Sequence, residues 1–189
     1  MATWQSLYPE SEVWIRNKDW RDTFYLTLLA RADVIDPESP VLIYPLQQTL
    51  DERLPMKSFV LGVEIDNQHK AYPVSIFENE SLLHDEMGTT SLLLVSARKN
   101  DYMQIFDRNV SGQTLTFALS GAEGNFKDNE TGSQWTPQGM CIAGDYEDTQ
   151  LVRIPHYNKI FWFVWADYHP ETTIFGADAV VGNIISSAA

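Results

Sequence analysis

The sequence predicts a mostly-β (α+β) protein, an antiparallel sandwich or barrel-like sheet with a few short helices. From Ser58 onward, segments rich in Leu, Ile, Val and Phe are separated by turn signals roughly every ten residues. The stretch Asp66-Asn-Gln-His is a good hairpin turn between two such segments. A chain of 189 residues is long enough for one domain with a sizeable core.

Residues 1–57 are predicted to be an amino-terminal helical and extended arm. Thr3 can cap a short helix that Pro9 ends, and Asp19 opens a second candidate helix over 20–31. Prolines then recur as far as Pro55, which is typical of extended backbone.

Residues 58–177 are predicted to form the β-rich core. The expected strands share an apolar or β-branched composition: 58–65, 70–76, 90–97, 102–107, 113–120, 133–135, 140–143, 150–154 and 172–175. The segment 158–168 predicts a helix that closes on Pro170. Residues 178–189 have small side chains and no motif, so we expect a flexible tail.

The charge balance argues against nucleic acid as a partner. The formal net charge is −13, and affinity for nucleic acid comes from Lys and Arg that neutralise phosphates. The longest strongly apolar run, 160–166, is far shorter than the ~20 residues that span a bilayer, so no membrane span is expected. The amino terminus has no signal-peptide pattern, which leaves the localisation open between the cytoplasm and an extracytoplasmic site reached with a signal since removed.

The sequence assigns no metal ligands and identifies no cofactor. Cys141 is the single cysteine, which rules out an intramolecular disulfide and a cysteine-based zinc site. No His-x-x-x-His spacing occurs, and the nucleophile and phosphate-binding signatures Gly-x-Ser-x-Gly and Gly-x-Gly-x-x-Gly are absent.

Several motifs in a fixed order resemble the bacterial family catalogued as domain of unknown function 3179. They are Val60-Leu-Gly-Val-Glu, Ala71-Tyr-Pro, Phe106-Asp-Arg, Gly112-Gln-Thr-Leu-Thr-Phe, Asp128-Asn-Glu-Thr-Gly-Ser-Gln-Trp and Trp165-Ala-Asp-Tyr-His-Pro-Glu-Thr. Many relatives carry Cys-Pro-Leu-Cys-Gly before Phe-Asp-Arg, where this chain has Ala97 and Asn100. The resemblance therefore implies that any thiol chemistry of those relatives does not operate here, and it implies no settled activity.

Five polar residues are candidates for catalysis: His84, Asp85, Arg108, Asp128 and Glu130. The two carboxylates of Asp128-Asn-Glu can act as an acid/base pair or as metal ligands, whereas a capped turn is the structural alternative that we favour. Arg108 can clamp a carboxylate ligand, although a structural salt bridge is the commoner role. His84 can be a base beside Asp85, but neighbouring residues on a strand point to opposite faces.

Aromatic residues and a histidine are candidates for ligand binding: Tyr72, Trp135, Trp162, Trp165 and His169. The favoured function is a non-redox binding or accessory module for a small molecule or a protein partner. The alternatives are a hydrolase- or isomerase-type enzyme, possibly assisted by a metal ion, and a scaffold with structural polar motifs. Convergence of Asp85, Arg108, Asp128 and a histidine in one pocket would favour the enzyme, and dispersal would favour the module or scaffold.

Overall fold

The computed structural model describes residues 9–10, 36, 39–42, 45–97, 102–121 and 124–176. The chain divides into two compact units, residues 1–44 and 45–189, and the strands described here belong to the second. The helices expected in the arm before Pro9 and over 20–31, and the tail 178–189, lie outside the described residues.

The first sheet has the strand order β12-β1-β2-β13. Its strands are β1 (Phe59–Ile65), β2 (Gln68–Pro73), β12 (His156–Phe161) and β13 (Thr173–Ile174). Strand β1 pairs antiparallel with β2 and β12, whereas β13 pairs parallel with β2. The turn between β1 and β2 places Asp66 and Asn67 at positive φ, as a tight two-residue hairpin requires.

The second sheet is the antiparallel meander β3-β4-β5. Its strands are β3 (Leu82–Met87), β4 (Thr90–Ala97) and β5 (Tyr102–Asp107), and the 3-10 helix η1 (Val74–Glu78) connects β2 to β3. From Leu92 onward every side chain of β4 is buried, so this strand has protein on both faces. Strand β3 lies at the edge of the sheet, which leaves part of its surface open.

The third sheet has the order β11-β10-β9-β8. Its strands are β8 (Phe117–Leu119), β9 (Phe126–Asp128), β10 (Gln134–Trp135) and β11 (Cys141–Ala143). A short hairpin, β6 (Asn109–Val110) and β7 (Gln113–Thr114), joins it to β5. The helix α4 (Trp162–Tyr168) follows β12 directly.

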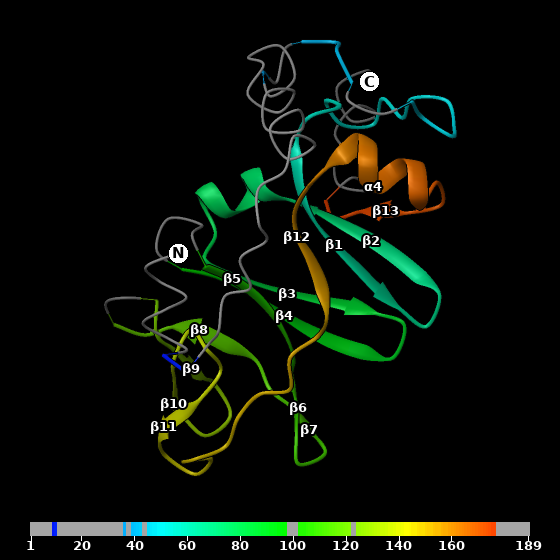
Figure 1. Cartoon of the computed structure of the whole chain (residues 1–189). Coiled ribbons are helices and arrows are strands. Elements are labelled where there is room, and N and C mark those ends of the chain that lie inside the picture. Colours follow the sequence, from blue (N-terminus) through cyan, green and yellow to red (C-terminus); the bar gives the residue numbers. More distant parts are fainter. Residues whose placement is uncertain are drawn as a thin grey trace, which may run out of the picture. The chain divides into compact units, whose positions relative to one another are not determined.

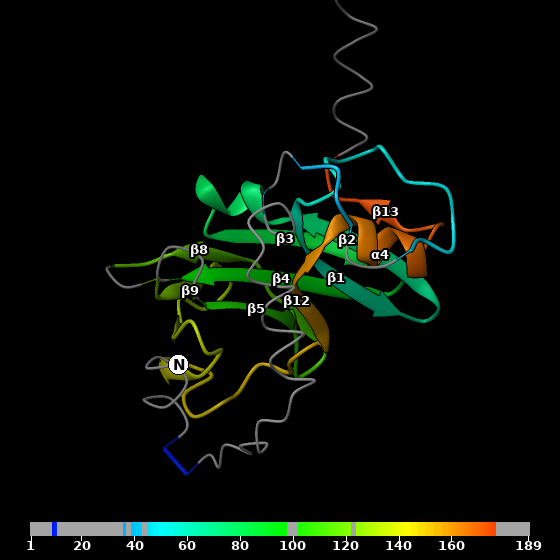
Figure 2. The same ribbon diagram turned by 45° about the horizontal axis from the view of Figure 1, so that its top comes forward.

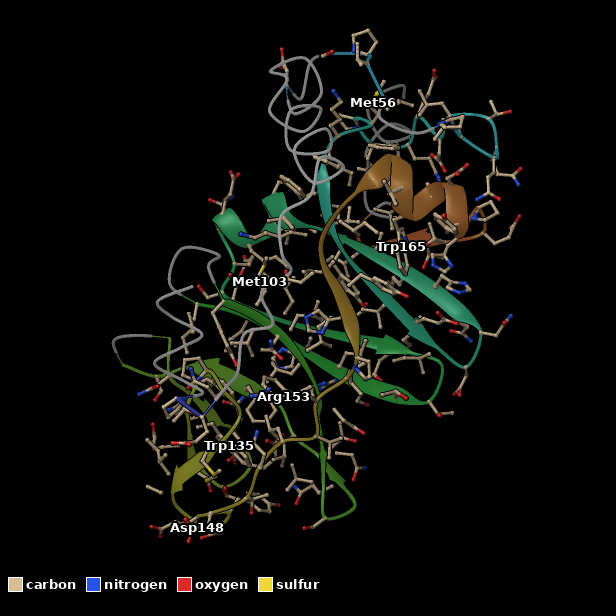
Figure 3. All side chains as sticks on the ribbon, in the orientation of Figure 1. Met56, Met103, Trp135, Asp148, Arg153 and Trp165 are labelled. Carbon is tan, nitrogen blue, oxygen red and sulfur yellow. The ribbon has the colours of Figure 1, made fainter. Side chains whose placement is uncertain are left out.

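Within the described part of the chain, three hydrophobic cores hold these layers together. One lies around Trp165, which Figure 3 labels, between the β1–β2 sheet and α4, whose ribbons Figure 1 shows beside each other. A second core, containing Met103 (labelled in Figure 3), lies between the β1–β2 sheet and the β3–β5 sheet, whose ribbons can be followed in Figure 2. The third packs Leu93 and Trp135 between β4 and the β8–β11 sheet. Residues alternate along β4, so Leu92 serves the second core and Leu93 the third.

Gly62 allows a close contact between β1 and the indole of Trp165 in the first core. A Cβ atom built at this position would lie 2.4 Å from Cε3 of Trp165, well inside van der Waals distance. The indole therefore lies directly on the β1 backbone, and it carries the ring of His169 against it at 4.1 Å between ring centroids.

The mostly-β, α+β fold class predicted from the sequence is confirmed. The sheets are antiparallel except for β13, and the described strands do not close into a barrel. None of the described helices is long and apolar enough to cross a membrane.

Several elements differ from those expected: the strand over 70–76 ends at Pro73, where η1 follows, and the strand over 113–120 is divided into β7 and β8. The helix predicted over 158–168 is wrong at its start, because β12 continues to Phe161 in register with β1 and α4 begins only at Trp162. The strand over 150–154 is reduced to isolated bridges, one of them between Phe106 and Arg153. Strand β3 was not expected, since three polar residues in a row, His84-Asp-Glu, conceal its alternating pattern.

Candidate functional site

Three polar side chains from β2 and from the edge strand β3 meet between the first two sheets. Oδ2 of Asp85, on β3, accepts a hydrogen bond of 2.7 Å from the phenol of Tyr72 and pairs with Nζ of Lys70 at 2.5 Å. Lys70 and Tyr72 stand two residues apart on β2 and so share a face. We call these three residues the Lys70–Tyr72–Asp85 cluster.

Aromatic rings enclose the ammonium group of this cluster. Nζ of Lys70 lies 5.7 Å from the ring centroid of Tyr72 and 5.6 Å from that of Phe175, within the range of cation–π attraction. Burial, and then the hydrogen bond to Asp85, raises the pKa of the Tyr72 phenol well above its usual range. The phenol therefore remains protonated and acts as a donor, not as a base.

A depression of about 320 Å³ opens beside the cluster. We call it the β2–β3 depression; it is lined by Asn67, Gln68, His69, Lys70, Glu86, Met87, Gly88, Glu171 and Thr173. Lys70 is its basic residue and is already paired with Asp85. Glu171 is exposed and makes no ion pair with any of the residues that the structure describes.

His84 lies on the opposite face of β3 from Asp85, as the alternation of side chains predicts. Its Nε2 atom accepts a hydrogen bond of 2.9 Å from the backbone N–H of Phe117. Burial lowers the pKa of His84 and the charge of Arg108 lowers it further, while Glu130 acts in the opposite direction. The neutral imidazole thus already uses its one ring lone pair, which leaves none for accepting a substrate proton.

Arg108 is buried and is bound within the protein. Its guanidinium donates to Oε1 of Glu86 at 2.5 Å and to the carbonyl oxygen of Leu115 at 3.1 Å. Its backbone N–H donates to the carbonyl of Ser91 on β4. These contacts tie the end of β5 to the β3–β4 hairpin. The ion pair with Glu86 is the structural salt bridge that was expected as the commoner role of Arg108.

Asp128 is fully buried and organises the turn that follows β9. Oδ1 accepts hydrogen bonds from the backbone and hydroxyl of Thr131 and from the backbone of Gly132, and Oδ2 accepts one from Nε1 of Trp135. Burial raises the pKa of Asp128, but these four hydrogen bonds outweigh it and hold the pKa below its usual range. Glu130 is exposed and accepts from the backbone and hydroxyl of Thr116, so the two carboxylates do not share a cavity.

The three candidate tryptophans are buried in cores. Trp135, Trp162 and Trp165 are at most 1% exposed. Their indole N–H groups donate to Asp128, to the carbonyl of Asp51 and to the hydroxyl of Thr172, respectively. None of the three lines the β2–β3 depression.

His169 caps the carboxyl end of α4, where its backbone N–H donates to the carbonyl of Trp165 at 2.9 Å. Its ring stacks on that of His69, with centroids 4.1 Å apart. Across residues 45–97, 102–121 and 124–176, one group of three has His, Cys, Asp or Glu ligand atoms close enough for a shared metal ion: Glu64, His69 and His169.

The sequence candidates are therefore distributed over several places. The structure joins Tyr72 to Asp85 and brings His84 near Arg108, while Asp128 and the tryptophans lie inside the layers. Lys70 was missed, although its two-residue spacing from Tyr72 on an expected strand could have indicated a shared face. Glu171 could not be found this way, because it reaches the depression only through the loop after α4.

The fold and the cluster define a mostly-β α+β protein of stacked sheets with a polar, charged depression at one sheet edge. The chain belongs to the family described as protein of unknown function (DUF3179), whose family model matches residues 1–172. No match was found among curated proteins or among solved structures.

Proposed function

We propose that this protein is a non-redox binding module that holds a small, polar, amine-bearing molecule in the β2–β3 depression. The observation that carries the proposal is the charge arrangement at this edge. Asp85 neutralises Lys70 at 2.5 Å, and Arg108 likewise pairs with Glu86. The carboxylate of Glu171 is then left to attract a ligand ammonium group.

The size and lining of the depression support a small ligand over a partner segment. A volume of about 320 Å³ is at the lower end of the range for small-molecule pockets. The side chains of Asn67, Gln68 and Thr173 offer amide and hydroxyl groups for hydrogen bonds, and Met87 adds an apolar wall. A molecule about the size of an amino acid fits this combination.

The state of the single cysteine supports a non-redox role. Cys141 is 1% exposed and lies in the third core, away from the Lys70–Tyr72–Asp85 cluster. Burial raises the pKa of its thiol, so the reactive thiolate is disfavoured.

The dispersal of the catalytic candidates favours binding over hydrolysis or isomerisation. His84 and Asp85 face different layers, and His84 has its lone pair engaged. Asp128 has both carboxylate oxygens occupied inside a turn. A general base would need a free lone pair within reach of a substrate proton.

Isothermal titration with small amines and amino acids, alongside carboxylic acids of matched size that lack the amine, tests the proposal. We expect saturable binding of at least one amine-bearing compound and none of its matched acid. Glu171→Gln should weaken that binding at least tenfold, since a charge-assisted hydrogen bond contributes about 1.5–3 kcal/mol. Glu147→Gln, an exposed carboxylate outside the depression, is the matched control. Equal weakening by both variants, or no binding by any amine, would contradict the proposal.

A further inference from the structure

We propose that Glu64, His69 and His169 together bind one divalent transition-metal ion of the Zn²⁺ type. One ligand atom from each side chain lies within 4.8 Å of the other two. Nε2 of His69 is 3.7 Å from Oε1 of Glu64. The two proposed sites share His69, which also lines the β2–β3 depression, but Glu64 and His169 lie outside that lining.

The backbone positions of the three ligands are set by regular structure. Glu64 and His69 are directly opposite each other in the β1–β2 ladder, one pair away from the tight turn. Side chains opposite each other in an antiparallel pair have Cβ atoms about 5 Å apart and lie on the same face. His169 approaches from the carboxyl end of α4, where hydrogen bonds to Trp165 and from Thr172 hold its backbone.

The distances suit a shared ion after small side-chain rotations. Zn²⁺ binds His nitrogen and carboxylate oxygen at about 2.0–2.2 Å in a tetrahedral site, so two of its ligand atoms stand about 3.3–3.6 Å apart. The separation of 3.7 Å between Nε2 of His69 and Oε1 of Glu64 is only slightly longer than this range. Because all three separations are within 4.8 Å, none has to close by more than about 1.5 Å, which the imidazole rings can supply because their χ2 torsion is broad.

The donor set selects the type of ion. Two imidazoles and one carboxylate suit Zn²⁺, Co²⁺ or Ni²⁺, whereas Mg²⁺ and Ca²⁺ prefer all-oxygen sites. Packing supports the ligand that comes from α4: the ring of His169 lies 4.1 Å from that of Trp165, whose N–H donates to Thr172 at 2.9 Å. The backbone carbonyl of His69 accepts a hydrogen bond from the hydroxyl of Thr173.

The position is open to solvent on the side of Glu64. The side chain of Glu64 is 51% exposed, and it also lines a depression of about 440 Å³ beside Asp66, His156 and Tyr157. Three protein ligands leave at least one coordination position for water or for a small ligand. The carboxylate of Asp66 adds a second negative charge that attracts a cation to this opening.

The test uses the whole protein, treated with a chelator and then titrated with Zn²⁺ by calorimetry and with Co²⁺ by visible absorption. We expect one equivalent of each ion to bind, with Co²⁺ giving the absorption of nitrogen and oxygen ligation. Glu64→Gln and His169→Ala should each raise the Kd for Zn²⁺ at least tenfold. The Glu64 variant changes an exposed group and so does not depend on the fold tolerating a core substitution.

His156→Ala is the matched control, because His156 lines the same depression but is outside the ligand group. Its Zn²⁺ affinity should equal that of the wild-type protein, and circular dichroism should show all variants folded. The proposal is overturned if the wild-type protein takes up no Zn²⁺. It is also overturned if His156→Ala weakens binding as much as Glu64→Gln, or if Glu64→Gln and His169→Ala leave binding unchanged.

Discussion

Replacing Asp128 by Asn is expected to destabilise the protein by about 2–4 kcal/mol. The carboxylate is fully buried, and its two oxygens accept four hydrogen bonds. The amide of Asn has one oxygen, which can accept either from Trp135 or from Thr131 and Gly132. Its NH₂ group must then face the remaining N–H or O–H donors and cannot accept from them. Each buried donor left without a partner costs about 1–3 kcal/mol, and the charge assistance of the remaining bonds is also lost.

Urea unfolding followed by circular dichroism measures this free energy of unfolding. Glu130→Gln, on the same turn but exposed, should change it by less than about 1 kcal/mol. The cost of Asp128→Asn should fall by about 1 kcal/mol or more in a Trp135→Phe background, where the indole donor is already gone. The lowered pKa of Asp128 means that its contribution is present above about pH 4 and is lost as pH falls through the native pKa.

A cost below about 1 kcal/mol for Asp128→Asn, with no coupling to Trp135, would refute this reasoning. The carboxylate would then be dispensable for the turn, and a functional role for Asp128 would regain weight. Unchanged stability at pH 3 relative to pH 7 in both the wild-type protein and the variant would contradict the pKa argument.

Three further predictions concern the first two sheets. Lys70→Met or Asp85→Asn alone should lower the free energy of urea unfolding by about 1–3 kcal/mol, because each leaves an unpaired partner whose side chain is under one-fifth exposed. The double variant should cost less than the sum of the two, and strict additivity would argue against the pair. Gly62→Ala should lower the free energy of unfolding by at least about 2 kcal/mol, since the new Cβ overlaps the indole of Trp165. An unchanged melting temperature would show that the indole can move away freely. The lowered pKa of His84 means that its protonation favours the unfolded chain, so the free energy of unfolding should fall as pH decreases below about 6.5. His84→Gln should flatten this dependence of stability on pH, and an unchanged dependence would assign the effect to other groups.

Local sequence signals predicted most of the first two sheets. The turn Asp66-Asn-Gln-His and the apolar or β-branched composition of the segments beside it predicted the β1–β2 hairpin, because both signals are local. The segment 158–168 was assigned wholly to a helix because apolar residues without a clear period fit either element. Strand β12 extends to Phe161 because this residue pairs with Phe59, and the two residues lie far apart in the sequence.

The candidate site was predictable in parts only. Alternation on a strand correctly separated His84 from Asp85, since this needs no tertiary information. The partner of Asp85 could not be derived, because Lys70 reaches it across two sheets whose stacking no local pattern specifies. For the same reason the approach of His169 to Glu64 was not foreseen, as one residue comes from a helix end and the other from a hairpin.

Amide chemical-shift mapping by NMR, with small amines and amino acids and their matched carboxylic acids, tests the central claim most directly. The account predicts saturable shifts from an amine-bearing compound that cluster on Asn67–Lys70 and Glu86–Gly88, on both sides of the β2–β3 depression. Those shifts should disappear with the matched acid and weaken in Glu171→Gln. Saturable shifts confined to another part of the protein, or none from any compound, would contradict the assignment of this depression as the binding site.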